Sequence, residues 1–304
     1  MSDIEKYRIF SEDERTIPIF SKGWWLDAVS PGEWDVFLIE ENGQIIAGLP
    51  YYLVTNRGGY REIKKAPLTQ NNGVWIRYPE DQKYEKKIRY EMKLMESFIE
   101  KIEAMNLAKY QQYFHYSVTN WLPFYWNGYS QTTRYTYVIQ DTSDMDEIYE
   151  SLNSNVRKQL RKAEKLVEVK ADLGIEQFFE LNQLTFERQN MDIPYSFDVV
   201  ARMDAACKER DARKILYCED EAGNIHSAAY FIWDEQSVYY LMSGSHPDFR
   251  HSQSLTLLLY EGIKLASRMG KKFDFEGSMK KNIEQHFRQF GAIQIPYFNI
   301  YKVF

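Results

Sequence analysis

Two acidic residues, Asp274 and Glu276, alternate with phenylalanines in the segment FDFEG at residues 273–277. Side chains of an extended strand point alternately to opposite faces, so this spacing predicts that both carboxyl groups lie on one face. If helices cover that face, burial and mutual repulsion raise the pKa of at least one acid, which could then take a proton from an attacking amine. The alternative is a strand at the sheet edge, where water and the flanking lysines compensate both acids.

A second group of polar residues ends the apolar strand YYLMSGS at residues 239–245. Ser243, Gly244 and Ser245 lie just before a predicted helix, and ligands commonly bind at the ends of strands in open sheets. Tyr240, in the same strand, could donate a proton to a leaving group. The alternative role for Tyr240 is packing among the other aromatic residues of the strand.

The segment NVRKQLRKAEK at residues 155–165 concentrates positive charge on a predicted helix. Four cationic residues, among them Arg161 and Lys162, share one face, and the opposite face is apolar. Arg157 and Arg161 could bind a phosphate of the donor, or of a lipid-linked acceptor, through paired N–H donors. The alternative is a solvated amphipathic helix that binds no ligand.

No residue pattern predicts a metal site or a covalent intermediate. Cys207 and Cys218 lack the CxxC or Cys/His spacing of a zinc site, and the histidines, including His246, His251 and His286, lack HxxxH spacing. No Ser-His-Asp or Cys-His arrangement stands out, which favours direct transfer over an acyl-enzyme. We expect the cysteines to be buried apolar residues and the histidines to serve in packing or at the surface.

The composition limits the classes of function. The formal net charge is −6 and the pI is about 5.6, which argues against a protein that binds DNA or RNA by general attraction to the backbone. No apolar run approaches the ~20 residues of a membrane-spanning helix. The N-terminus MSDIEKYRIF has no signal-like apolar core. We therefore expect a cytoplasmic protein without a transmembrane segment.

The elements that must position these residues follow a repeated order. Residues 34–53 and 213–232 both read as β-hairpins and align when Gly43 is placed on Gly223, which indicates a duplicated unit. The chain has 304 residues, and single hydrophobic cores stop growing near ~250 residues. We therefore expect two domains, 1–140 and 141–304.

Helices and strands are predicted from periodicity and turn signals. In the first half we expect helices at 19–30 and 82–105 and strands at 34–41, 45–54, 109–118 and 134–139. In the second half we expect helices at 145–165, 175–190, 197–211, 252–269 and 280–290 and strands at 166–172, 214–220, 225–233, 237–246, 271–277 and 297–304. Ser252 is expected to cap the helix at 252–269, and Gly270 to end it. Hairpins alternating with returning helices imply an α/β fold with mixed sheets covered by helices.

The strand VYYLMSGSH, which runs through PDFRHSQSL into a helix, resembles the GNAT acyltransferase fold. The segments SNVRKQLRKAEK and FDFEGSMKKNIEQHFRQFGA resemble more specifically the FemABX-related branch. This resemblance implies two tandem GNAT-like domains, each a mixed, mostly antiparallel sheet flanked by helices. It also implies transfer of an acyl or aminoacyl group from a thioester or ester donor to an amine or hydroxyl, commonly during cell-wall or surface-polymer synthesis.

The resemblance also implies where the donor binds. In GNAT proteins that use acyl-CoA, amides of the loop before the central helix hold a pyrophosphate, and the matching span 250–255 here is RHSQSL. It keeps Arg250 but lacks both glycines of the family pattern, which makes close approach to a phosphate harder. We expect a donor site at Arg250, Ser252 and Ser254, with an oxyanion role for the main chain around Ser243–Ser245.

Two further departures from the family pattern concern the choice of donor and a cationic residue near the end of the chain. Classical members use aminoacyl-tRNA and carry a long coiled-coil insertion that this chain lacks, so acyl-CoA is the preferred donor and tRNA the second choice. The family's lysine motif near Phe290-Gly291 places Phe287 at the lysine position, one step from Arg288. Arg288 is the candidate cationic substitute.

Together these patterns predict an acyl- or aminoacyl-transferase. Its first domain would shape the acceptor cleft, and its second would hold the donor and the general base. The acceptor would be a small molecule or a lipid-linked precursor, approaching at the strand exit formed by Gly277 and Ser278. The alternative is a non-catalytic binding protein in which the missing glycines mark a decayed donor site.

Overall fold

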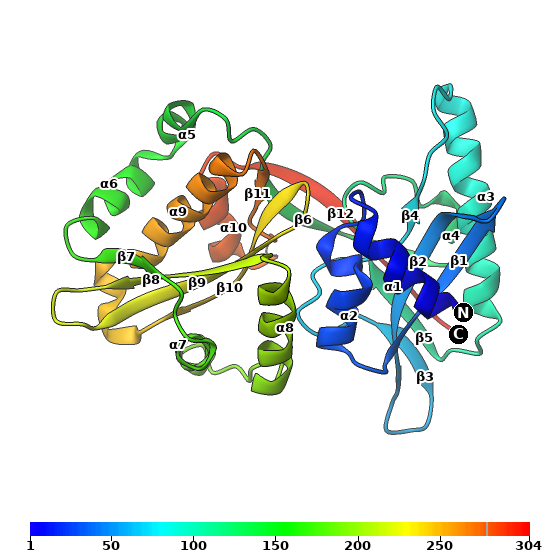
Figure 1. Ribbon diagram of the computed structural model, residues 1–304, viewed down its shortest axis with the longest axis horizontal. Coiled ribbons are helices and arrows are strands. Elements are labelled where there is room, and N and C mark those ends of the chain that lie inside the picture. Colours follow the sequence, from blue (N-terminus) through cyan, green and yellow to red (C-terminus); the bar gives the residue numbers. More distant parts are fainter. Residues whose placement is uncertain (278) are drawn as a thin grey trace. The chain divides into compact units, whose positions relative to one another are not determined.

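The computed structural model describes residues 1–277 and 279–304, which divide into two compact units (Figure 1). Unit 1 contains Met1–Arg134 and Pro296–Phe304, and unit 2 contains Tyr135–Ile295. The domains 1–140 and 141–304 remain a prediction. The first break lies close to the proposed boundary, whereas the last strand, assigned by the sequence to the second domain, ends in unit 1.

Unit 1 is a mixed sheet with helices on both faces. Its strands are ordered β1-β2-β3-β5-β12, β4 also pairs with β2, and β3 and β5 run parallel. The elements are α1 (Asp3–Asp13), η1 (Ile19–Ser21), α2 (Gly23–Val29), β1 (Trp34–Glu41), β2 (Gln44–Thr55), β3 (Arg61–Lys64), β4 (Trp75–Ile76), α3 (Tyr84–Glu103), β5 (Lys109–Tyr113), α4 (Leu122–Trp126) and the C-terminal part of β12 (Ile293–Val303). Tyr7 of α1 packs on Trp34, and α3 and α4 cover the core around Phe98 and Phe124 on the other face.

Most of the elements predicted for this half form. β1 and β2 make the predicted hairpin, with Gly43 at a φ of +77°. The helix predicted at 19–30 divides into η1 and α2, and the strand predicted at 109–118 ends at Tyr113. The elements α1, β3, β4 and α4 were not predicted, because their short or polar segments lack a clear period.

The strands of unit 2 are ordered β6-β11-β10-β9-β8-β7, and β10 and β11 run parallel. Its helices α5, α6, α9 and α10 lie on one side of the sheet, and α7 and α8 lie on the other (Figure 1). The elements are the C-terminal part of β6 (Ser130–Ile139), α5 (Met145–Ser151), α6 (Ser154–Ala163), β7 (Glu168–Ala171), α7 (Ile175–Glu187), α8 (Phe197–Glu209), β8 (Arg213–Glu219), β9 (Ile225–Trp233), β10 (Ser237–Ser245), η2 (Pro247–Ser252), α9 (Ser254–Arg268), β11 (Lys272–Asp274) and α10 (Lys281–Arg288).

The second predicted hairpin, β8–β9, turns at Gly223 with a φ of +85°. Each hairpin has a register shift beside its turn, at Ile39/Glu40 in one and at Cys218/Glu219 in the other. Both hairpins are therefore confirmed, and they share an irregularity that the sequence did not indicate.

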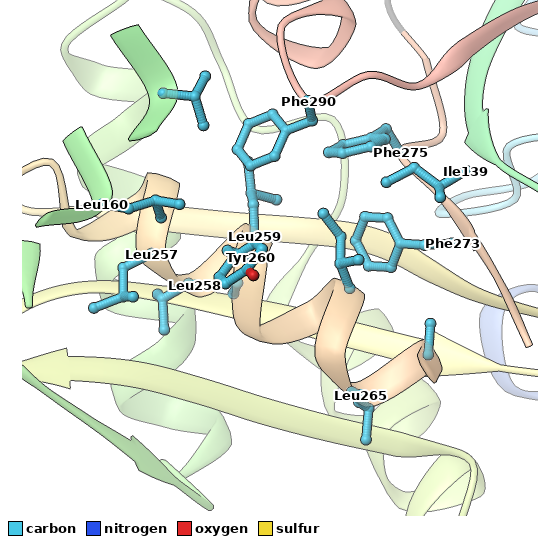
Figure 2. Close-up of a cluster of buried hydrophobic side chains, with 14 of the residues drawn as sticks. Ile139, Leu160, Leu257, Leu258, Leu259, Tyr260, Leu265, Phe273, Phe275 and Phe290 are labelled. Atoms are coloured by element: carbon cyan, nitrogen blue, oxygen red, sulfur yellow. The ribbon is translucent and has the colours of Figure 1, made fainter. Parts of the chain in front are cut away.

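The core of unit 2 lies between the sheet and α9 (Figure 2). Leu258 and Leu259 of α9 are fully buried, and Phe273 of β11 packs edge-on against Phe275 at 4.8 Å. Phe290 closes the cluster above Phe275, with ring centroids 5.4 Å apart. This packing fixes β11, and with it Asp274, against the helix that follows β10. None of the helices in the described parts of the chain combines the length and the apolarity needed to cross a bilayer.

Three predicted boundaries in unit 2 are wrong. The helix predicted at 145–165 is two helices, because α5 ends with Leu152 in an extended conformation, and Asn153 then caps α6 with its side chain and donates its backbone N–H to the carbonyl of Gln289. The helix predicted from Ser252 starts at Ser254, with Gln253 as its N-cap. The strand predicted at 271–277 covers only Lys272–Asp274.

The backbones of β10 and α7 meet at Gly244. A Cβ built there would lie 2.4 Å from the carbonyl carbon of Leu181 and 2.5 Å from the nitrogen of Asn182. We expect Gly244→Ala to lower the free energy of unfolding by about 1–3 kcal/mol, because two backbones must separate to make room. Urea denaturation measures this. Gly174→Ala is the matched control, because its Cβ would meet nothing closer than 3.7 Å; an equal loss in both variants would contradict the prediction.

Candidate functional site

β10 and β11 separate near the centre of unit 2. Their parallel pairing ends at Tyr239 opposite Asp274, while β9 accompanies β10 as far as Ser245. Beyond Tyr239, one edge of β10 therefore has no strand partner among the described residues. The register of β9 and β10 also shifts in this stretch, at Leu241.

Asp274 is a buried acid at the point of separation, with 1% of its surface exposed. Its Oδ1 accepts hydrogen bonds from the hydroxyl of Thr136 in β6 and, at 2.8 Å, from the backbone N–H of Glu276. No described residue donates to Oδ2. Burial raises the pKa of Asp274 to about 6 despite these two hydrogen bonds. The carboxyl therefore titrates close to neutral pH.

Glu276 is also buried, with 7% exposed, so the alternative of two solvated edge acids is wrong. The reasoning from alternation is wrong as well, because β11 ends at Asp274 and Glu276 has a left-handed φ of +61°. Strand alternation does not continue through such a residue. The described link between the two acids is the N–H of Glu276 on the carboxyl of Asp274.

Tyr240 lies on the other face of the sheet from Asp274, since Asp274 is level with its neighbour Tyr239. Its ring packs against Phe231 and Phe287, and its hydroxyl donates to the Oγ of Ser243. Burial raises the pKa of Tyr240 to about 12, which keeps the hydroxyl protonated at neutral pH. No described contact joins Tyr240 to Asp274; both lie where β10 and β11 separate.

The strand end Ser243–Ser245 is bound by α7. Asn182 donates to the carbonyl of Ser243 at 2.7 Å, and the N–H of Ser245 donates to Thr185 Oγ1 at 3.1 Å. The Ser245 amide therefore already has an acceptor in this arrangement, and an oxyanion role for it stays a prediction. The N–H of Ser243 points to the same edge as its carbonyl and has no described acceptor there, so it stays a candidate.

A pocket of about 170 Å³ opens at the start of α9. Of the residues predicted to bind the donor, Ser245, Arg250 and Ser254 line it, whereas Ser243, Gly244 and Ser252 do not. The complete lining is Arg188, His226, Ser245, Arg250, Gln253, Ser254, Leu255, Thr256 and His286. The pocket thus gathers side chains from α7, β9, β10, the loop before α9, α9 itself and α10.

Two arginines in this pocket have no carboxylate partner among the described residues. Arg188 and Arg250 both line this pocket, and burial together with the charge of Arg250 lowers the pKa of Arg188. Like charges brought together without a counter-charge repel each other. An anion bound between them would remove this repulsion.

His226 adds an unsatisfied polar atom to the pocket lining. Its Nε2 lies 3.1 Å from Asp220 Oδ2, and its ring stacks on Phe249 at 4.4 Å. Because the carboxylate accepts, Nε2 carries the hydrogen. The buried Nδ1 has no hydrogen-bond partner among the described residues. His286, expected in packing or at the surface, also lines the pocket, and burial lowers its pKa.

The loop before α9 turns without glycine. Gln253 adopts a left-handed φ of +62°, a conformation that costs a residue with a Cβ about 1–2 kcal/mol. Ser252, fully buried, donates to the carbonyl of Phe249 at 2.8 Å, and Ser254 accepts from Ser227 at 2.7 Å. These bonds hold the turn, so the missing glycines do not prevent it.

The other predicted anion-binding residues mostly serve the protein's own structure. Arg157 donates to the carbonyl of Glu150 at 2.7 Å, and Arg161 reaches the hydroxyl of Tyr149 at 3.4 Å. Arg288 pairs with Glu284 at 2.9 Å on its own helix. Lys162 is exposed on α6. None of these four side chains lines the pocket at α9, and their role in substrate binding stays a prediction.

Cys207 and Cys218 are buried and free, as predicted. Burial raises the pKa of Cys218 to about 12 and that of Cys207 further, so neither supplies a thiolate at neutral pH. Within residues 1–277 and 279–304, no His, Cys, Asp or Glu side chains gather in a group that could hold a metal ion. Gly277 is described, with a φ of +62°, but Ser278 of the predicted strand exit lies outside the described residues.

Sequence reasoning missed Arg188, His226 and the neighbours of Ser254 as pocket residues. Arg188 ends α7 and His226 begins β9, and neither stands in a motif. Only the fold brings them to Arg250. An available signal was that Arg188 lies near the end of a predicted helix and Arg250 in the polar segment between a predicted strand and the next helix, but this is common at helix and strand ends.

Residues 150–281 match the model of the acetyltransferase (GNAT) domain. Among curated proteins, none is similar enough in sequence to count as a match.

Solved structures resemble the whole chain. FemX is 13% identical, with a TM-score of 0.69 over 98% of this chain and 96% of its own. L-PGS from Bacillus licheniformis is 10% identical, with a TM-score of 0.56 over 98% of this chain and 91% of its own. A tandem GNAT protein from the clavulanic acid biosynthesis pathway is 7% identical, with a TM-score of 0.52 over 98% of this chain and 92% of its own.

At these identities the likeness establishes the fold, and it confirms the predicted α/β class of tandem GNAT-like sheets flanked by helices. The chain therefore shares its fold with FemX and with a tandem GNAT protein, and residues 150–281 match the model of the acetyltransferase (GNAT) domain.

Proposed function

We propose that the protein is an acyl- or aminoacyl-transferase that moves an acyl group directly from an activated donor to an amine or hydroxyl acceptor. One observation carries the proposal: Arg188 and Arg250 lie together in the pocket at the start of α9, with no carboxylate partner among the described residues. Such a pocket suits the phosphates of a carrier such as acyl-CoA. It adjoins the GNAT-type strand edge, because Ser245 lines it.

The residues present fit a phosphate-bearing donor. The arginine pair supplies charge, and the N-terminus of α9 supplies backbone N–H groups. The pocket is compact, whereas a length of tRNA backbone needs an extended basic groove with stacking platforms. Acyl-CoA is therefore the preferred donor and aminoacyl-tRNA the alternative.

Each proposed catalytic group has the protonation state that its role needs. Asp274, with a pKa of about 6, is largely ionised at neutral pH and would accept the proton of the attacking amine at Oδ2. Tyr240 stays protonated and would give its proton to the leaving group as the bond to the acyl carbon breaks. The N–H of Ser243 would hold the acyl oxygen. Glu276 would assist through its backbone contact with Asp274.

The acceptor we propose is a small molecule or a lipid-linked precursor of the cell wall or a surface polymer, used in the cytoplasm. The fold likeness to FemX and L-PGS supports this choice. The cations of α6, with Lys162 outermost, would bind the acceptor's phosphate, and Arg288 would serve as a further cation at the end of α10.

Tyr240→Phe is expected to lower kcat by about 10–100-fold with little change in KM, because the leaving group loses its proton donor. The loss should shrink with donors whose leaving group has a lower pKa, since these need less protonation. Steady-state rates with a series of acyl thioesters measure both effects. Tyr260→Phe is the control, a buried tyrosine on α9 that lies away from the open edge of β10. A Tyr240→Phe enzyme with the parent rate would rule out the proton donor.

The function as a whole is tested by ligand binding followed by transfer. A thermal-shift panel contains acetyl-CoA, longer acyl-CoAs, aminoacyl-tRNA and UDP-linked wall precursors. A ligand at 100 times its dissociation constant stabilises the folded state by about 2.7 kcal/mol. The ligand that stabilises is then offered in labelled form with candidate amines. No stabilisation by any donor would favour a non-catalytic binding protein instead.

A further inference from the structure

Three serine hydroxyl groups are buried where β9 meets the start of α9. Ser227 of β9 and Ser252 before the helix are fully buried, and Ser254 at the first position of the helix is 4% exposed. The hydroxyl oxygens of Ser227 and Ser254 lie 2.7 Å apart. A buried hydroxyl without a hydrogen-bond partner costs about 1–3 kcal/mol. Each of these protons therefore needs an acceptor.

The proton of Ser227 is directed to Ser254, whose hydroxyl oxygen accepts it. The other described partner of Ser227 is the thiol of Cys218, and sulfur is a weak acceptor. In the opposite direction, Ser254 would give its proton to Ser227, and the proton of Ser227 would be left in the core with that weak acceptor. Burial therefore favours donation from Ser227 to Ser254.

Ser254 then keeps a proton for the pocket at the start of α9. It lines that pocket together with the arginine pair. Its oxygen already accepts from Ser227, and no described residue accepts its proton. Thr256, another hydroxyl residue of the lining, differs because it donates to Gln159 Oε1 at 3.1 Å. An acceptor bound in the pocket would satisfy the proton of Ser254.

The backbone of Ser254 is fixed as well. Its N–H donates to the hydroxyl of Ser252 at 3.3 Å, and its carbonyl accepts from the thiol of Cys218 at 3.6 Å. Gln253, directly before it, turns the chain with its left-handed φ of +62°. The hydroxyl of Ser254 is thus held in place before a ligand arrives, which lowers the entropic cost of binding.

We propose that Ser227 is a positioning residue of the donor pocket, because it orients the hydroxyl of Ser254 to donate to an oxygen of a bound phosphate. The inference rests on the proposed function, in which this pocket binds the phosphates of the donor. A hydrogen bond to a charged acceptor is stronger than one between neutral groups. Donation from one hydroxyl to the next strengthens the second bond. The two serines would thereby supply a donor in a loop that lacks the glycines of the family pattern.

A double-mutant cycle with inorganic pyrophosphate as the probe tests this role. Ser254→Ala is expected to raise the dissociation constant about 10–100-fold, the range for one hydrogen bond to a charged group. Ser227→Ala should raise it about threefold to tenfold, because the hydroxyl of Ser254 remains but loses its orientation. In the Ser254→Ala background, Ser227→Ala should change the affinity by less than about twofold. Calorimetric titration of the four proteins measures these effects.

Affinity and melting temperature together distinguish positioning from a structural role. A purely structural role of Ser227 would lower the melting temperature and leave the affinity of the folded protein unchanged. Ser237→Ala is the matched control, because Ser237 of β10 is a serine with 1% exposed that does not line the pocket. This control should bind pyrophosphate as the parent does. In transfer assays, Ser227→Ala should raise KM for the donor and leave kcat within about twofold of the parent.

The possible negative results separate the role of Ser227 from the role of the pocket. If the parent protein does not bind pyrophosphate, the phosphate-binding role of the pocket is overturned, and with it the role of Ser227. If the parent binds it and Ser227→Ala binds equally well, the role of Ser227 is overturned while the pocket stands. The same holds if the effects of Ser227→Ala and Ser254→Ala simply add in the double variant.

Discussion

Asp274→Asn is expected to lower the rate of acyl transfer by about 10²–10⁴-fold in a protein that remains folded. Asparagine keeps the shape of the side chain and an oxygen for the hydrogen bonds from Thr136 and the N–H of Glu276. It cannot accept the proton of the acceptor amine. Initial rates at saturating donor measure the effect, and circular dichroism checks the fold.

The pH dependence of kcat/KM in the parent enzyme should report the ionisation of Asp274. Because the base works in its ionised form, kcat/KM is expected to rise as the pH increases through about 6 and then to level off. In Asp274→Asn this ascending limb should be missing. A variant that kept both the rate and the limb would show that Asp274 only holds the end of β11.

The raised pKa of Asp274 also predicts that the free energy of unfolding falls as the pH rises. An aspartate in an unfolded chain has a pKa of about 3.9, and burial raises that of Asp274 to about 6 in the folded state. Between these values the folded protein binds more protons than the unfolded one, so its free energy of unfolding falls as the pH rises from about 4 to about 6. The asparagine in Asp274→Asn cannot ionise, so this contribution to the fall in the free energy of unfolding is absent from the variant.

The variant should therefore gain stability relative to the parent as the pH is raised from 4 to 7.5. Urea denaturation of both proteins at the two pH values measures the difference. A difference that is independent of pH would contradict a raised pKa. The loss of activity with a gain in stability at neutral pH would then mark Asp274 as a residue kept for function.

Arg250→Gln is expected to raise the dissociation constant of a phosphate-bearing donor about 10–100-fold, the range for one hydrogen bond between charged groups. Arg188→Gln should act in the same direction, since Arg188 lines the same pocket. The effect should fall on KM more than on kcat, because the phosphate lies away from the reacting carbon. Calorimetric titration with acyl-CoA measures the affinity directly.

The melting temperature of the ligand-free variant distinguishes a binding role of Arg188 and Arg250 from a structural one. The nearness of Arg250 lowers the pKa of Arg188 through repulsion, in addition to burial. Removing one charge relieves the repulsion, so ligand-free Arg250→Gln should melt at the same temperature as the parent or higher. Arg89→Gln, at an exposed position of α3, is the control for total charge. An equal loss of affinity in that control would point to a general charge effect.

Patterns of neighbouring residues predicted the parts of the fold that depend on interactions between residues close in sequence. The hairpins at Gly43 and Gly223 depend on short turns, and the apolar face of α9 depends on helical spacing. The burial of Asp274 agrees with the covered strand, which was one of the two alternatives for this segment. Such features need little information from distant residues.

Contacts between distant segments decided the rest. Asn153 breaks the long polar helix because its N–H is bound by Gln289, far along the chain. Glu276 leaves the strand conformation although its spacing fits a strand, and its N–H turns back to Asp274. Arg188 and His226 reach Arg250 only through the packing of α7 and β9. Sequence spacing carries no signal for such long-range convergence.

Helix α7 contacts both the edge of β10 and the pocket at the start of α9. One rigid helix carries Asn182 and Thr185, which bind the edge, and it ends at Arg188, which lines the pocket. Its backbone lies directly on Gly244, so the helix cannot slide without moving the strand. A bound anion would attract Arg188. Any resulting shift of α7 would also move Asn182, which holds the carbonyl of Ser243. In the function we propose, donor binding and alignment of the acyl group would therefore act on the same helix.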